Sequence, residues 1–124
     1  MLKRLLITAA TLSFAGLAFA AAPVKVADTA LGKVLVDSQG MTLYTFTKDS
    51  AGKSACNGGC AQNWPPLKAE AGAKAGDGYS LVTRDDGSQQ WAYQGKPLYT
   101  WVKDSKPGNT TGEGVNQVWH VAKP

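Results

Sequence analysis

Two phenols and two carboxylates recur at the same spacing in this chain. Tyr44 precedes Asp49 by five residues, and Tyr99 precedes Asp104 by the same interval. A pair of carboxylates could bind a cation or act as general acid and base. An Asp in a turn more commonly accepts hydrogen bonds from backbone N–H groups that follow it, which lowers its pKa. We therefore predict a structural role for both carboxylates. The expected donors lie in the turns at residues 50–52 and 105–108.

Two cysteines form the sharpest local signal. Cys56 and Cys60 enclose Asn-Gly-Gly, and in an exported chain such a pair most simply closes a small disulfide loop. Thiol redox catalysis favours a C-x-x-C motif at the start of a helix within a βαβ pattern, and the sequence has neither. The alternative is a copper or zinc site made by Cys56, Cys60 and His120, the single histidine.

The first twenty residues read as an export signal. Lys3 and Arg4 precede an apolar run over 5–19, and Ala18-Phe19-Ala20 supplies small residues for cleavage. The run is shorter than the roughly 20 residues that span a bilayer. We predict a signal peptide at 1–20, a periplasmic or secreted protein and no membrane span. The cleavage point has no cysteine, so we also expect no lipid anchor.

The charge of the chain gives no reason to expect nucleic-acid binding. Without Lys3 and Arg4, the 13 basic residues fall to 11, against 9 acidic residues. The remaining lysines are scattered, and Arg84 is the one arginine left. A nucleic-acid surface needs a clustered basic patch, which this pattern does not supply.

The residues with candidate chemistry sit inside an internal repeat. Residues 39–50 return as 94–105 with eight of twelve positions identical, and Trp64 and Trp119 share the same 55-residue offset. A fixed period indicates one structural unit used twice. We therefore expect one domain at 31–124. Its repeats span about 31–66 and 86–121, after a flexible leader at 21–30.

The periodicity of the sequence favours strands throughout. Residues 33–36 and 42–47 flank a turn cluster and predict one hairpin, and 79–83 with 89–93 predict another around Asp86-Gly87. Residues 68–78 are expected to form a loop, and no segment shows a sustained helical period. The predicted fold is all-β: a single small domain of two tandem, pseudo-symmetric β-hairpin repeats.

Aromatic residues are numerous for a domain of this size. Each buries on the order of 150–250 Å², area that a small core needs. We expect most of them in the core, and a sugar- or peptide-binding platform is the alternative. The residues are Tyr44, Phe46, Trp64, Trp91, Tyr93, Tyr99, Trp101 and Trp119.

The motif Tyr-x-aromatic-x-x-Asp identifies a resemblance. The chain resembles the bacterial secreted repeat family of unknown function, described as predicted lipoproteins with a conserved Yx(FWY)xxD motif. Unlike many relatives, it lacks the lipobox cysteine. The resemblance implies an extracytoplasmic location and a tandem β repeat, and it implies no activity. The motif residues here are Tyr44, Phe46, Asp49, Tyr99, Trp101 and Asp104.

These observations favour a non-enzymatic exported β module for binding or envelope interaction. We expect no cofactor, and the candidate partners are an envelope protein or a glycan. The first alternative is a small metal-binding or redox protein that uses Cys56, Cys60 and His120. The second is a hydrolase centred on Asp49 and Asp104.

Overall fold

The computed structural model describes residues 21–124, so the predicted signal peptide lies outside the described residues. The first half contains β1 (Val24–Thr29), β2 (Gly32–Asp37), β3 (Tyr44–Phe46), the short helix α1 (Gly59–Asn63) and β4 (Lys68–Ala69). The second half contains β5 (Tyr79–Thr83), β6 (Gln89–Tyr93), β7 (Lys96–Pro97), the 3₁₀ helix η2 (Val115–Gln117) and β8 (Trp119–Val121). Most of these elements are strands, as the sequence predicts.

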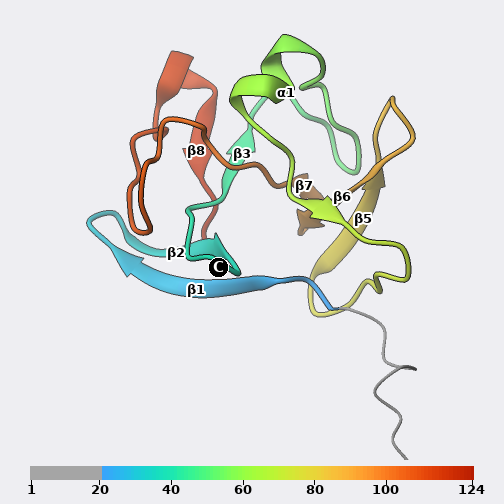
Figure 1. The fold of residues 1–124 in the computed structure, drawn as a ribbon, viewed down its shortest axis with the longest axis horizontal. Helices are drawn as coiled ribbons and strands as arrows, with labels where there is room; N and C mark the ends of the chain where they lie inside the picture. The colour runs from blue at the N-terminus through green and yellow to red at the C-terminus, as the bar shows by residue number, and fades with distance from the viewer. Residues whose placement is uncertain (1–20) are drawn as a thin grey trace, which may run out of the picture.

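Two antiparallel hairpins, one in each half, form the outer parts of the fold (Figure 1). β1 pairs with β2, and β5 pairs with β6 in a sheet that β4 and β7 extend. The β5–β6 turn contains Gly87 at φ 87°, a left-handed conformation that glycine adopts without steric cost. The hairpin predicted around Asp86-Gly87 is therefore present.

The predicted flexible leader at 21–30 is wrong, because most of it is strand β1. Its six residues pair with β2 from Val24↔Asp37 to Thr29↔Gly32. Ala27 packs against the core, while Val26 stays exposed. The short Val-Lys-Val alternation supplied the strand signal.

The first predicted hairpin is shorter than the sequence indicates. Residues 33–36 and 42–47 meet at a single Val36↔Thr42 bridge, with one further backbone bond from Leu43 N to Leu35 O at 2.9 Å. Beyond that point the chain leaves β2. β3 pairs instead with β8, which comes from the other repeat.

The tail of each repeat pairs with the central strand of the other. Phe46 lies opposite Trp119 in the β3–β8 ladder. In the second repeat, Tyr99 bridges Pro66, and the Val102 N–H donates to Asn63 O at 3.1 Å. The two repeats are therefore interlocked rather than placed side by side as separate units.

The centre of this arrangement is a bridge between equivalent tyrosines. Tyr44 N donates to Tyr99 O at 2.7 Å, and Tyr99 N donates to Tyr44 O at 3.0 Å. Because each tyrosine makes the bond that the other makes, an approximate two-fold axis passes between them. Both tyrosines are fully buried.

The core has two parts. The larger one surrounds the central tyrosines. The smaller one contains Leu43 and Leu98, which are equivalent in the two repeats. The larger cluster consists of Val34, Val36, Tyr44, Cys56, Trp64, Tyr99, Trp119 and Val121.

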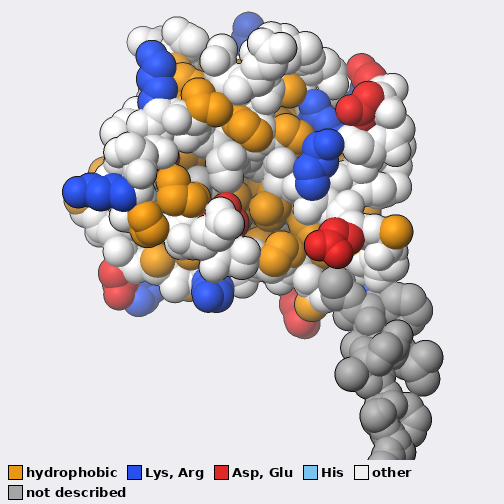
Figure 2. Space-filling view, viewed as in Figure 1, with side chains coloured by type: hydrophobic (Ala, Val, Ile, Leu, Met, Phe, Trp, Pro, Cys, Tyr) orange, Lys and Arg blue, Asp and Glu red, His pale blue; other side chains and the backbone are white. Residues whose placement is uncertain are grey.

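The surface in Figure 2 carries both signs of charge. Lys, Arg, Asp and Glu side chains are interspersed around the rim of this face, and hydrophobic side chains show across its middle. No block of one sign appears on this face. In residues 21–124, no helix is long and apolar enough to cross a membrane.

Candidate functional site

The repeated tyrosines and aspartates pair between the repeats. The Tyr44 hydroxyl donates to Asp104 Oδ2 at 2.6 Å, and the Tyr99 hydroxyl donates to Asp49 Oδ2 at 2.7 Å. Each carboxylate thus bonds the phenol of the other repeat, 60 or 50 residues away in the chain. Hydrogen bonds to an ionised carboxylate are short and roughly twice as strong as neutral ones.

Both carboxylates also accept a backbone N–H, but the predicted donors are wrong. Asp49 Oδ1 accepts Ala55 N at 2.7 Å, and Asp104 Oδ1 accepts Thr111 N at 3.0 Å. The turns at 50–52 and 105–108 do not supply these bonds. In the first turn, Gly52 N donates to Gly95 O instead. Each carboxylate therefore fastens the far end of its loop rather than the adjacent turn.

Burial is the main influence on the ionisation of Asp49 and of the two phenols. It raises the pKa of Asp49, although the bonds from Ala55 and Tyr99 and the charge of Arg84 act in the opposite direction. The predicted lowering of the Asp49 pKa is therefore wrong. Burial also raises the pKa of Tyr44 and of Tyr99, and the partner carboxylates add to both effects. The phenols stay protonated and act as donors.

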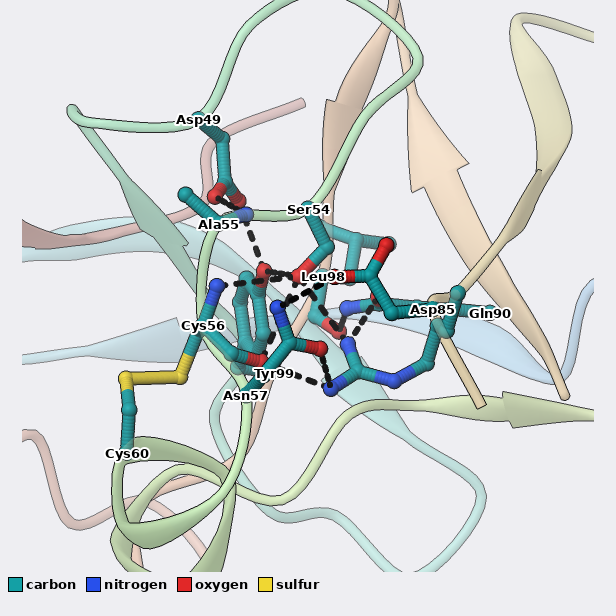
Figure 3. Close-up of a disulfide and its surroundings, with 11 residues drawn as sticks. Asp49, Ser54, Ala55, Cys56, Asn57, Cys60, Asp85, Gln90, Leu98 and Tyr99 are labelled. Carbon is teal, nitrogen blue, oxygen red and sulfur yellow. Dashed lines mark hydrogen bonds between the residues drawn. A yellow bond between two sulfur atoms is a disulfide. The ribbon is translucent and has the colours of Figure 1, made fainter. Parts of the chain in front are cut away.

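The Tyr99–Asp49 pair continues through Ser54, which lies beside both in Figure 3, to a buried arginine. Arg84 is 6% exposed. Its Nη1 donates to Ser54 Oγ at 3.0 Å and to Gln90 Oε1 at 2.8 Å. The Ser54 and Tyr99 hydroxyl oxygens are 2.6 Å apart. The single phenolic proton goes to Asp49, so Ser54 is the donor to Tyr99.

These bonds form one directed chain from a cation to an anion. The guanidinium donates to Ser54, Ser54 to Tyr99, and Tyr99 to Asp49. A buried charge is costly unless it is paired, and here two hydroxyls connect the charges of Arg84 and Asp49. Arg84 was not among the residues predicted to be buried. Its one signal was that it is the only arginine in the chain after residue 20.

The predicted disulfide is present. Cys56 and Cys60 are joined, and they lie beside the arginine network (Figure 3). The Cys56 carbonyl accepts Arg84 Nη2 at 2.6 Å, and Asn57 Oδ1 accepts the same nitrogen at 3.3 Å. The small loop therefore does more than close on itself, because it holds two acceptors against the buried cation.

The alternative metal site is not assembled. Both sulfurs are consumed by the disulfide between Cys56 and Cys60, and the His120 Nδ1 is 2.8 Å from Glu113 Oε2. Over residues 21–124, no group of three or more His, Cys, Asp or Glu side chains could hold a metal ion. The alternative prediction of a copper or zinc site made by Cys56, Cys60 and His120 is therefore wrong.

Four aromatic rings form a continuous stack through the middle of the molecule. Trp64 and Trp119, equivalent in the two repeats, stack at 3.8 Å between ring centroids and 3° between planes. Phe46 stacks on Trp119 at 4.2 Å, and Trp101 stacks on Trp64 at 3.9 Å. Tyr44 and Tyr99 meet Trp64 and Trp119 edge-on. Thus equivalent aromatic residues occupy equivalent places in the stack.

An open groove of about 470 Å³ lies over one side of this stack. It is built by both repeats, between α1 and η2. Two adjoining backbone positions in η2, Asn116 at φ 51° and Gln117 at φ 62°, are left-handed without being glycine. The groove is lined by Phe46, Lys48, Gly59, Cys60, Asn63, Trp64, Asn116, Val118 and Trp119.

The remaining predicted aromatics lie outside the groove. Trp91 is 1% exposed in β6, and Tyr93 packs on Tyr79 at 4.9 Å between ring centroids. Trp101, at the end of the stack opposite Phe46, has the Lys103 ammonium 5.9 Å from its ring centroid. Of the eight predicted aromatics, Phe46, Trp64 and Trp119 line the groove.

The repeats match a known family. A family described as a secreted repeat of unknown function matches residues 25–68 and again residues 80–123, together more than half of the chain. The chain belongs to this family of secreted repeats. No curated protein matches it, and no solved structure matches it.

In this secreted repeat, the residues of the Tyr-x-aromatic-x-x-Asp pattern have separate roles. The Tyr and the Asp connect the two repeats to each other, as in the Tyr44–Asp104 bond. The aromatic residue between them, Phe46 or Trp101, ends the ring stack. The pattern therefore accounts for the joining of two repeats and the position of the groove between them.

Proposed function

We propose that this protein is an exported, non-catalytic module that binds a glycan of the cell envelope in the groove between its repeats. One observation carries the proposal: the groove combines aromatic rings with amide side chains, and both repeats build it. Ligand sites occur preferentially where two structural units meet, and they pair apolar walls with a few placed polar groups.

Phe46 supplies the apolar platform. One face of its ring stacks on Trp119, and no aromatic ring covers the other face among residues 21–124. The side chain is half-buried and lines the groove. A sugar ring has an apolar C–H face, and burying it against an aromatic ring removes both surfaces from water.

Asn63 and Asn116 supply the polar groups. Each amide offers two N–H donors and a carbonyl acceptor, which suits hydroxyl groups that both donate and accept. The left-handed backbone at Asn116 and Gln117 supports this assignment. Such conformations cost of order 1–3 kcal/mol each and cluster at ligand sites.

The groups with catalytic potential support a non-catalytic role. Tyr99 and Ala55 occupy the two oxygens of Asp49, while Tyr44 and Thr111 occupy those of Asp104. A general acid or base needs its proton-transfer atom to reach the substrate. Asp104 is 6% exposed, and its bonds to Tyr44 and Thr111 connect parts of the fold.

Binding can be tested with the exported protein and purified peptidoglycan. Co-sedimentation measures retention on the polymer, and soluble peptidoglycan fragments can be titrated by tryptophan fluorescence. We expect saturable binding, with Phe46→Leu weakening it by about tenfold, the effect of losing about 1.4 kcal/mol. Asn116→Ala should weaken it as well, because it removes a polar contact.

Trp101→Leu is the matched control, since Trp101 ends the same stack but does not line the groove. It should lose stability without losing affinity. Absence of binding, or equal loss of affinity in Phe46→Leu and Trp101→Leu, would overturn the proposal.

A further inference from the structure

A second hollow, of about 340 Å³, lies beside β3, β7 and β8. It differs from the aromatic groove in charge. Of the described residues that line it, three are basic and none is Asp or Glu. The lining residues are Thr45, Thr47, Tyr93, Gln94, Lys96, His120, Val121, Ala122 and Lys123.

This hollow and the aromatic groove lie on opposite faces of the β3–β8 ladder. Thr45 pairs with His120, and both line the hollow. The next pair, Phe46 with Trp119, lines the groove. Successive strand residues point to opposite faces, so the two sites are separate.

Several donors around the hollow have no partner within residues 21–124. These are the hydroxyls of Thr45 and Thr47, the side-chain amide of Gln94 and the Lys96 ammonium. By contrast, Nη1 and Nη2 of the buried Arg84 each donate to protein acceptors. Polar groups that converge on a concave surface without protein partners are free to bind a ligand.

Two carboxylates lie next to the hollow without lining it: Glu113 contacts His120, and Asp49 shares an adjoining pocket with other wall residues. Lys123 Nζ donates to Leu31 O at 2.6 Å, and an ammonium has two further donors. Glu113 accepts both His120 Nδ1 and Val121 N, each at 2.8 Å. This carboxylate is therefore engaged beside the hollow, and it fixes the imidazole ring at the wall. Asp49 lines an adjoining hollow, which shares Thr45, Thr47, Gln94 and Lys96 with this one.

We propose that this hollow binds a phosphate group. At neutral pH a phosphate group carries one to two negative charges and several acceptor oxygens, which match lysine ammonium groups surrounded by hydroxyl and amide donors. A metal cation would be repelled by the same lysines. A neutral sugar would leave their charge uncompensated. The phosphate can be free in solution or part of a lipid head group.

The test is an NMR titration of the exported protein with inorganic phosphate, at ionic strength held constant with chloride. We expect saturable amide shifts around residues 45–47, 94–96 and 120–123. Lys96→Gln should weaken binding by about tenfold, as expected for the loss of one charge-assisted contact. Thr45→Val, which keeps the charge, should weaken it by a smaller measurable factor.

Lys25→Gln is the matched control, because it removes one positive charge from exposed β1, outside the hollow. A second arm measures sedimentation with vesicles of phosphatidylglycerol and of phosphatidylcholine. If Lys96→Gln and Thr45→Val weaken the binding of inorganic phosphate and Lys25→Gln does not, the ligand is free phosphate. If this order of effects appears only with phosphatidylglycerol vesicles, the ligand is a lipid head group. No binding in either arm, or equal weakening by Lys25→Gln and Lys96→Gln, would overturn the proposal.

Discussion

At the scale of single residues, the buried polar groups differ between the repeats although their central bonds match. The Tyr99 hydroxyl is connected by hydrogen bonds through Ser54 to the Arg84 guanidinium. Tyr44 instead receives the backbone N–H of Gly112 at 3.1 Å. The same Tyr–Asp bond is therefore supported by a side-chain network in one repeat and by backbone in the other, so substitutions at equivalent positions should not have equal effects.

Gly112 is closely packed against this second support. A Cβ added there would lie 2.8 Å from Tyr44 Cε2 and 2.8 Å from Trp64 Cη2. We expect Gly112→Ala to lower the free energy of unfolding by about 1–3 kcal/mol, because two buried rings must shift. Urea unfolding measures the effect. Gly59→Ala is the control, since nothing lies within 4 Å of an added Cβ there. An equal effect of the two substitutions would contradict the packing argument.

The pH dependence of stability should separate two carboxylates with opposite pKa shifts. Burial raises the pKa of Asp49, so its contribution to stability is present at low pH and is lost as pH rises through the folded-state pKa. For Glu113, burial opposes ionisation, but bonds from His120 and Val121 hold its pKa below the ordinary value. Its contribution is therefore present at neutral pH and is lost on acidification.

As the pH falls from about 6 to about 3, where carboxylates titrate, we expect the free energy of unfolding to decrease more in Asp49→Asn than in the wild type. Glu113→Gln should make it decrease less over the same interval. Urea unfolding at several pH values measures both slopes. Changes of the same sign in the two variants would contradict the assigned shifts.

At the scale of elements, the disulfide loop is a local reinforcement. The second repeat has Thr111 and Val115 where the first has Cys56 and Cys60, and it forms its Tyr–Asp bond without a bridge. We expect the double variant Cys56→Ser, Cys60→Ser to lower the free energy of unfolding by about 2 kcal/mol, the chain-entropy value for so short a ring.

Reduction of the wild-type protein should reproduce that loss, which provides the control for the two substitutions. Because Cys56 O and Asn57 also hold Arg84, NMR shifts in the double variant should concentrate around that side chain. Complete unfolding of the double variant, or free thiols in the exported protein, would refute a local role.

Local patterns revealed the elements whose partners are close in sequence. The Asp86-Gly87 hairpin and the Cys56–Cys60 loop both depend on residues only a few positions apart. β3 shows the limit of such patterns. Its alternation indicated a strand, but its partner β8 lies in the other repeat, and nothing local in the sequence states that pairing. β1 was missed because its alternation is short.

The same limit applies to the candidate site. A tyrosine five residues before an aspartate gives each Asp two possible phenols, one in each repeat, and the shared Tyr–Asp spacing does not distinguish them. The bonds of Arg84 and the groove over Phe46 arise from tertiary contacts between segments that the sequence separates. Sequence periodicity predicts which residues form strands, not which distant loops meet.

At the scale of the whole molecule, the two repeats depend on each other. Each central strand pairs with the tail of the other repeat, and each carboxylate bonds the other repeat's phenol. The Trp64–Trp119 stack crosses the same boundary. The groove proposed to bind a glycan exists only because these exchanged contacts bring the two repeats together.

The most direct test of this exchange is a pair of double-mutant cycles measured by urea unfolding. The first combines Tyr44→Phe with Asp104→Asn, which bond each other. The second combines Tyr44→Phe with Asp49→Asn, which share a repeat but not a bond. We predict a coupling energy of about 1–3 kcal/mol in the first cycle and close to zero in the second. A coupling within the repeat that equals or exceeds the coupling between repeats would contradict the account.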